Sequence, residues 1–188
     1  MGRLQGVSIH SEHPFLPPAE DQDAVRRLRG RLAATVTLWT SGEGAARAGL
    51  TVTSLLVAGG EPGRILALID PDSDLLDAVR ERGRFVVSVL GPAQRGLADA
   101  FSGTAPAPGG GFAQAEFVQT AWGPRPAASG TWAGCRLDGE VAVGWSALLT
   151  GSVEQVQLDE TAPLVHLRGR YGHWTPGLPG VQGGGPLR

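Results

Sequence analysis

Hydroxyl side chains are concentrated in one short, strand-like segment, Thr51-Val-Thr-Ser54. Alternate residues of a strand share a face, so Thr51 and Thr53 can line one groove, whereas Ser54 points across toward a turn or a neighbouring strand. Such a segment offers hydrogen-bonding groups without bulk. The plainer alternative is β-sheet propensity alone, because threonine is common in strands of every kind.

A second candidate is Ser73, which stands at the start of a run with the pattern of a helix. The first turn of a helix exposes backbone N–H groups and partial positive charge, and both attract an anion such as phosphate. Arg80 or Arg84 could then serve as its counterion. The alternative is that Ser73 only caps the helix.

The single cysteine and the histidines offer little further chemistry. Cys135 cannot form an intrachain disulfide, and no evident base accompanies it, so we expect it to be a packing residue. His10 and His13 lie in a polar stretch and His166 lies within a predicted strand. These positions do not form a metal-binding pattern, and we expect no metal site.

Length and charge narrow the class of protein. The 188 residues fit one compact domain, and 16 basic against 18 acidic residues give a net charge of −2. Neither nucleic acid nor a membrane is therefore an expected partner. No segment approaches the ~20 apolar residues of a spanning helix, and the first residues lack a signal-peptide pattern. We expect a cytoplasmic protein.

Three helices are predicted from periodicity and capping residues. The first, with Asp21 or Asp23 as its cap, should cover the domain with Val25, Leu28 and Leu32. The other two are bounded by serine, proline and glycine signals. The predicted helices occupy residues 21–32, 73–83 and 92–103.

Strand signals fill most of the remaining sequence. An Asp138-Gly139 pair indicates a turn. Residues 104–130 should form a long loop with at most one short helix, and this loop would be either a lid or a connection without a function. The pattern favours a barrel with helical covers rather than βαβ units. The predicted strands occupy 34–40, 50–57, 64–69, 85–90, 137–145, 148–158 and 164–167. The expected organisation is an arm at 1–20, one domain at 21–174 and a flexible tail at 175–188.

Five blocks of sequence follow a recognisable order. Gly49-Leu-Thr-Val-Thr-Ser-Leu55 resembles a G-x-T-x-S-S-F strand, and Ala67-Leu-Ile-Asp-Pro-Asp-Ser73 resembles a strand with serine at the next helix start. Gly83-Arg-Phe-Val-Val-Ser-Val-Leu90 is similar to SGxFxVNVL, and Gln94 to Gly103 to QxxLAxxFSG. Pro163 to Gly172 looks like a PLLYxRGRY ending. Together they resemble the flavin reductase-like, FMN-binding split barrel family over residues 30–174.

This resemblance implies a fold and a ligand. The fold is mainly β with covering helices, a split β-barrel of the Greek-key antiparallel type. The ligand is a flavin, whose flat ring has hydrogen-bonding edges and whose tail carries phosphate. Leu55, Phe85 and Phe101 are expected in the core rather than against the ring, and Arg170 with Tyr171 has the alternative of a solvated strand end. The residues implied to bind the cofactor are Thr51, Thr53, Ser54, Asp70, Ser73, Arg84, Ser88, Arg170 and Tyr171.

The sequence departs from the family at one functional segment. Members with reductase activity usually carry Gly-Asp-His before an x-L-F-I-G-x-V strand, and the histidine is associated with nicotinamide binding. Here Gly144-Trp-Ser146 precedes the corresponding Ala147-Leu-Leu-Thr-Gly-Ser-Val153. The interval suggests a trimmed hairpin. Trp145 would either cap the ring or serve as a core or interface anchor, and His173 is a remote candidate for a replacement acid.

Two functions remain open at this point. The first is a homodimeric, FMN- or FAD-dependent oxidoreductase that uses NAD(P)H and supplies reduced flavin to itself, a small substrate or a partner monooxygenase. The second is a non-catalytic or degenerate flavin-binding module without efficient hydride transfer, which the missing Gly-Asp-His favours. A deazaflavin or another planar cofactor in the same groove is a third interpretation.

Overall fold

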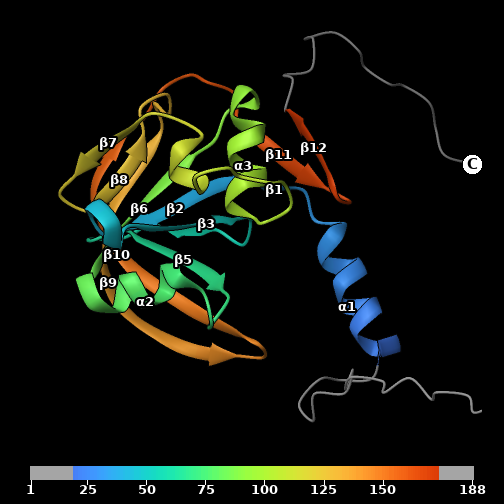
Figure 1. Cartoon of the computed structure of the whole chain (residues 1–188). Coiled ribbons are helices and arrows are strands. Elements are labelled where there is room, and N and C mark those ends of the chain that lie inside the picture. Colours follow the sequence, from blue (N-terminus) through green and yellow to red (C-terminus); the bar gives the residue numbers. More distant parts are fainter. Residues whose placement is uncertain (1–18, 174–188) are drawn as a thin grey trace, which may run out of the picture.

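A computed structural model describes residues 19–173 and the side chains of 24–172. Figure 1 labels most of its helices and strands. Within this range the helices are α1 (Ala19–Gly30), α2 (Asp74–Arg82) and α3 (Arg95–Phe101), with 3-10 turns at Gly44–Ala46, Pro92–Gln94 and Gly111–Ala113. The strands are β1 (Ala34–Thr35), β2 (Thr37–Ser41), β3 (Ala48–Val52), β4 (Leu56–Ala58), β5 (Arg64–Ile69), β6 (Arg84–Val89), β7 (Phe117–Thr120), β8 (Gly123–Pro126), β9 (Trp132–Val143), β10 (Ser146–Gln157), β11 (Leu164–Leu167) and β12 (Arg170–His173).

Seven strands form the main sheet, in the order β3-β2-β6-β9-β10-β5-β4. Neighbouring strands are antiparallel throughout. Strands from both halves of this sheet contribute side chains to one core, for example Val52 of β3 and Ile65 of β5, so the sheet curls around it. The end strands β3 and β4 are not paired with each other, and the barrel is therefore not closed. The predicted mainly β, split-barrel fold is confirmed.

The core explains why these sequences form these strands. Trp39 of β2 and Phe85 of β6 stack at its centre, with ring centroids 5.0 Å apart. Helix α2 covers one end of the barrel with Leu75, Leu76 and Val79, all fully buried. Phe85 is a core residue, as expected from the sequence.

A second apolar cluster lies on the other face of β2. Leu38 and Leu90 pack there with Leu97 and Phe101 of α3. The small sheet β1-β11-β12 adjoins this cluster through Leu164. The predicted helix after Pro92 is confirmed as α3. The apolar cluster holds this helix against the outer face of the barrel.

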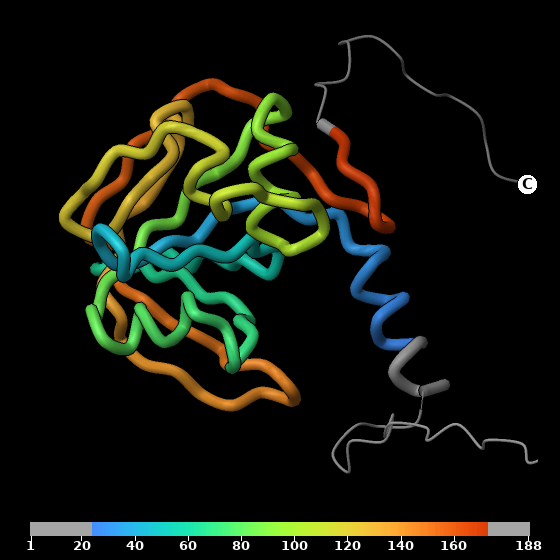
Figure 2. Tube along the Cα trace, in the orientation of Figure 1, coloured from blue at the N-terminus to red at the C-terminus, as the bar shows by residue number. Residues whose placement is uncertain are grey.

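Helix α1 forms as predicted but does not cover the barrel, and that expectation is wrong. Val25, Leu28 and Leu32 are 69%, 62% and 63% exposed. In Figures 1 and 2 the helix stands beside the body, on the same side as the β11–β12 hairpin. The physical reason is its attachment: the Arg168 N–H donates to the Gly30 carbonyl at 2.8 Å, and this bond fixes the end of α1 to the small sheet.

The Asp138-Gly139 pair is not a turn. β9 runs through it, and because Thr150 pairs with Gly139 while Gly151 pairs with Leu137, Asp138 is the extra residue of a β-bulge. The Asp138 carboxylate accepts from Ser152 Oγ at 2.6 Å, which stabilises this irregularity. The predicted strands 137–145 and 148–158 are therefore the two arms of one longer hairpin.

Two other segments are more ordered than the sequence indicates. The predicted loop 104–130 contains the β7–β8 hairpin, in which Phe117 pairs with Pro126. The predicted strand 50–57 is two strands, because the backbone leaves the β2 partner after Val52 and continues as β4 beside β5. Residues 53–55 therefore connect the two ends of the curled sheet. The predicted arm at 1–20 and tail at 175–188 lie almost entirely outside the described residues.

Candidate functional site

A groove of about 330 Å³ lies where the two ends of the curled sheet meet the tip of the β9–β10 hairpin. Its position on end strand β3 is significant, because an end strand directs alternate backbone N–H and C=O groups away from its single neighbour. Its volume falls within the range of small-molecule sites. The lining residues are Arg29, Leu50, Thr51, Val52, Thr53, Ser54, Leu68, Asp70, Trp145 and Ser146.

The three hydroxyls of the β3 segment differ in their partners. Thr51 Oγ1 donates to the Ala98 carbonyl at 2.8 Å and so joins β3 to α3. Ser54 Oγ donates to the Leu68 carbonyl at 2.9 Å and accepts from the Leu68 N–H at 3.0 Å, as its predicted orientation toward a neighbouring strand requires. Thr53 forms no side-chain hydrogen bond within the described residues. Its hydroxyl is therefore available to a ligand.

Asp70 lies at the end of β5, on the floor of the groove, and Ser73 follows it. One Asp70 carboxylate oxygen accepts from the Asp72 N–H at 3.0 Å, which shapes the turn into α2. Ser73 Oγ accepts from the Leu76 N–H at 3.3 Å and donates to the Asp70 carbonyl at 2.7 Å. The capping role of Ser73 is confirmed, and it does not line the groove.

Trp145 and Ser146 line the groove from the hairpin tip. β9 and β10 form a continuous hairpin that is paired up to Val143 and Ser146, and Gly144-Trp145 forms its two-residue turn. Gly144 adopts φ +58°, a conformation that this tight turn needs and that glycine adopts without a steric penalty. Trp145 is 46% exposed, so the indole is not a core residue and is partly open to solvent. It forms an aromatic wall at the edge of the groove.

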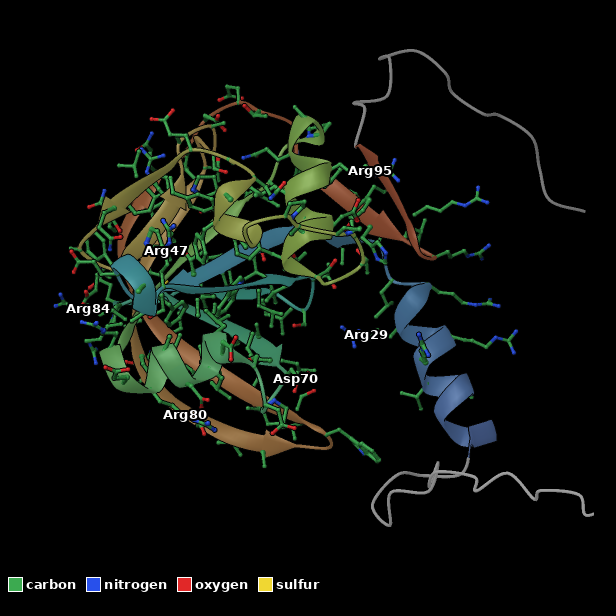
Figure 3. All side chains as sticks on the ribbon, in the orientation of Figure 1. Arg29, Arg47, Asp70, Arg80, Arg84 and Arg95 are labelled. Atoms are coloured by element: carbon green, nitrogen blue, oxygen red, sulfur yellow. The ribbon has the colours of Figure 1, made fainter. Side chains whose placement is uncertain are left out.

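Arg29 of α1 is a charged lining residue that sequence analysis missed. Figure 3 shows its guanidinium between α1 and the barrel, on the side of Asp70. Among side chains 24–172, no carboxylate is within ion-pair distance of it. No sequence pattern marks this arginine, because a tertiary contact of the adjacent Gly30 brings it to the groove.

The predicted arginines on and after α2 are engaged elsewhere. Arg80 Nη2 lies 2.8 Å from Glu140 Oε1 and Arg80 Nη1 lies 3.0 Å from Asp77 Oδ1, and the hydrogen bond to Glu140 raises the pKa of Arg80. Arg84 lines a separate cavity of about 380 Å³ with Arg82, Glu43 and Trp122. Figure 3 shows Arg84 on the opposite side of the body from Arg29.

Three other predicted residues also lie outside the groove lining. Ser88 is fully buried in β6 between Leu38 and Trp132, and its hydroxyl has no partner in the described part of the chain. Tyr171 packs on the α3 cluster, and burial, followed by its hydrogen bond to Asp99, raises its pKa. Arg170 is exposed on β12. Of the predicted set, the structure brings Thr51, Thr53, Ser54 and Asp70 together. The side chain of His173 lies outside the described residues.

The remaining features add no competing site. Another cavity, of about 540 Å³ between α3 and residues 105–128, is lined by Asp99 and Glu116 and by no cation. The described side chains contain no cluster of three or more metal-ligating residues. Between residues 19 and 173 no helix is long and apolar enough to span a membrane. Cys135 is buried, and desolvation raises the pKa of its thiol to about 12, which confirms it as a packing residue.

Residues 29–175 match the flavin reductase like domain family, which accounts for most of the chain. The protein belongs to this family. Among curated flavin reductase relatives, the reductase component of 4-nitrophenol 4-monooxygenase/4-nitrocatechol 2-monooxygenase of Rhodococcus opacus is 26% identical over 157 residues, 83% of each chain. FMN reductase (NADH) RutF 2 of Methylorubrum extorquens is 29% identical over 162 residues, 82% of this chain and 90% of the relative.

A solved structure confirms the flavin reductase fold. The NADH:FAD oxidoreductase SgcE6 of Streptomyces globisporus C-1027, in complex with NAD and FAD fragments, superposes with a TM-score of 0.76 at 21% identity. The match covers 86% of this chain and 98% of that one. At this identity the likeness concerns the fold.

The groove of this flavin reductase-like domain fits a flavin. Thr53 presents an unengaged hydroxyl and β3 an outer backbone edge, and both suit the polar edge of an isoalloxazine ring. The Trp145 indole suits the ring face. Arg29 adds one positive charge for an anionic tail. The groove thus offers a hydroxyl, an aromatic side chain and a cation.

Proposed function

We propose that this protein is an NAD(P)H-dependent flavin oxidoreductase that binds FMN or FAD and supplies reduced flavin to a partner monooxygenase. The groove carries this proposal, because it combines the free Thr53 hydroxyl, the indole of Trp145 and the unpaired guanidinium of Arg29. The flavin reductase relatives support it, since one is the reductase component of a monooxygenase and another is an NADH-dependent FMN reductase.

Different side chains of the groove would have different roles in binding the flavin. Thr53 and the outer edge of β3 orient the ring, Trp145 packs on it and excludes water, and the Thr51 and Ser54 bonds hold β3 in place. When bound, the flavin itself supplies the capacity to accept a hydride from the nicotinamide. The protein contributes position and a partly desolvated site.

The experiment is a titration followed by reduction. Purified protein should quench the fluorescence of added FMN or FAD, and the bound flavin should bleach on anaerobic mixing with NADH or NADPH. Failure of both flavins to bind would refute the proposal. A deazaflavin that binds in their place would favour the third interpretation of the groove.

A second candidate function is a flavin-binding module that does not transfer hydride. The observation in its favour is the hairpin tip, where Gly144-Trp145-Ser146 replaces the expected Gly-Asp-His. Flavin binding without bleaching by either nicotinamide would select this function. Bleaching at a rate that saturates with nicotinamide concentration would exclude it.

We further propose a cytoplasmic homodimer. The support is a set of exposed apolar side chains around the groove, on α1 and on end strand β4, where Leu56 and Val57 are 66% and 71% exposed. Isolated domains rarely leave so much apolar surface uncovered. A second copy packed here would cover Val25 and Leu28 and narrow the groove opening.

The dimer has its own test. The double substitution Val25→Asp and Leu28→Asp should convert a dimer into a monomer in size-exclusion chromatography with light scattering. The matched control is Val118→Asp, because Val118 is exposed on β7, away from the groove. A wild-type protein that runs as a monomer would contradict this part of the proposal and leave the groove unaffected.

A further inference from the structure

We propose that Arg29, at the end of α1, is the residue that binds the flavin phosphate and so selects phosphorylated flavins over riboflavin. This inference rests on the proposed function, because it concerns the ligand of the same groove. It assigns the phosphate-binding role to an arginine that lies outside the five sequence blocks.

The charges of the groove are the first argument. Its lining contains one cation, Arg29, and one carboxylate, Asp70. The guanidinium lacks an ionic partner among the described side chains, and unlike Arg84, for which no ion pair is found either, it lines this groove. A planar guanidinium matches phosphate oxygens with two parallel N–H donors. An unpaired arginine directed into a groove is therefore ready for an anion.

The alternative phosphate sites are less suitable. Arg80 is neutralised by Glu140 and Asp77, and Arg84 lines another cavity. The start of α2, where Ser73 stands, is surrounded by carboxylates, which satisfy the helix dipole and repel a second anion. The carboxylates around this helix start belong to Asp70, Asp72, Asp74 and Asp77.

The structure also explains how Arg29 is held. The neighbouring Gly30 carbonyl accepts the Arg168 N–H at 2.8 Å, so the last turn of α1 is attached to the β11–β12 turn. Arg168 has φ +50°, which places this N–H at the tip of that turn. The cation therefore has a fixed base even though α1 contributes little to the core.

The test compares FMN with riboflavin, which differ only by the phosphate. Dissociation constants are measured by flavin fluorescence quenching for wild type, Arg29→Ala and Arg29→Lys. We expect Arg29→Ala to weaken FMN binding by about tenfold or more, as the loss of a charge-assisted hydrogen bond predicts. Riboflavin binding should change by less than about twofold, and Arg29→Lys should retain part of the preference.

Two arginines provide matched controls. Arg31→Ala removes an exposed charge next to α1, and Arg84→Ala removes the counterion that the sequence suggests; neither lines the groove. Both should keep the FMN preference of the wild type. Circular dichroism and a urea midpoint for each variant confirm that the fold is intact.

Each outcome decides the matter. An equal loss of FMN and riboflavin affinity in Arg29→Ala, or a lost preference in Arg84→Ala, overturns the assignment of Arg29 while flavin binding stands. Equal wild-type affinity for FMN and riboflavin also overturns it. A wild type that binds neither flavin refutes the proposed function itself, and the two failures are thus distinguishable.

Discussion

At the groove, the hydroxyls of Thr51, Thr53 and Ser54 lie within four consecutive residues and have different partners. Thr51 bonds to α3 and Ser54 bonds twice to Leu68, whereas Thr53 has no partner among the described residues. A hydroxyl that already bonds to the backbone stabilises the fold, and a free one serves a ligand better. We therefore assign the Thr53 hydroxyl to ligand binding, and the Thr51 and Ser54 hydroxyls to stabilising the fold.

Substitutions at Thr53 and Ser54 should therefore have different consequences. Thr53→Val should weaken FMN binding by about 1 kcal/mol and change the free energy of unfolding by less than about 0.5 kcal/mol. Ser54→Ala should lower the free energy of unfolding by about 1–2 kcal/mol because the Leu68 N–H and carbonyl lose their partner. Urea denaturation and flavin titration measure the two quantities. The reverse pattern would show that the roles are exchanged.

Trp145 should act through its ring. Trp145→Ala should weaken flavin binding by about 1 kcal/mol and Trp145→Phe by less, since aromatic contacts of this kind contribute about 0.5–1.5 kcal/mol. Trp122→Phe is the control, because the Trp122 indole donates to Glu154 away from the groove. Titration of each variant with FMN gives the affinities. Unchanged binding in Trp145→Ala would remove the indole from the site.

Sequence reasoning found the hydroxyl segment because strand alternation and local motifs are readable in the chain. It missed Arg29, since the pattern of α1 emphasises Val25 and Leu28 and gives no sign of the Gly30–Arg168 bond. Arg84 looked suitable by proximity in sequence to Ser73, yet the strand that follows α2 carries it away from the groove. Long-range contacts, rather than local propensity, decide which charges share a site.

Among the elements, the β9–β10 hairpin shows how one signal can have two structural meanings. Asp-Gly favours a tight turn, but here Asp138 accepts from Ser152 Oγ, Arg64 Nε and Arg136 Nη2, so the strand continues through a bulge. The turn occurs instead at Gly144-Trp145, which brings the indole to the groove. The three helices and the strands β2, β5, β6 and β11 were predictable because their periodicity and caps are local, whereas the β7–β8 hairpin and the break after Val52 were not.

The end of α2 provides a prediction for an element. Gly83 has φ +65° at the C-terminal cap, so Gly83→Ala should lower the free energy of unfolding by about 1 kcal/mol. Gly96 is helical in α3 with open space around its Cβ position, and Gly96→Ala should raise the free energy of unfolding by roughly 0.4–1 kcal/mol. Urea denaturation of the pair tests the sign of each change. Equal effects would contradict the assigned backbone conformations.

For the whole molecule, few side chains titrate at alkaline pH. The sequence contains no lysine, one tyrosine and one cysteine. Burial raises the pKa of Cys135 from the ordinary value of 9.0 to about 12, and burial also raises the pKa of Tyr171. In both cases the folded state disfavours the deprotonated form, so the unfolded chain loses its protons first.

The free energy of unfolding should therefore fall at high pH. The substitution Cys135→Ala should remove the part of this fall that the thiol causes. The contribution of Cys135 is complete below about pH 9 and is lost as pH rises toward 12. In this window the free energy of unfolding of the wild type should decline more steeply than that of Cys135→Ala, by up to about 1.4 kcal/mol per pH unit. Urea denaturation from pH 8 to 11 measures the slopes. Parallel slopes would show that the thiol ionises in the folded protein.

The Ser54 contact with Leu68 joins the two ends of the barrel sheet, and it gives the barrel one place where it can open. The Leu68 amide is protected from hydrogen exchange by a side chain rather than by a neighbouring strand. Ser54→Ala should speed exchange of this amide while Ile69 remains protected, and bound flavin should slow it in the wild type because the groove borders the same contact. Amide exchange at Leu68 would thus report both the breathing of the fold and the occupancy of its site.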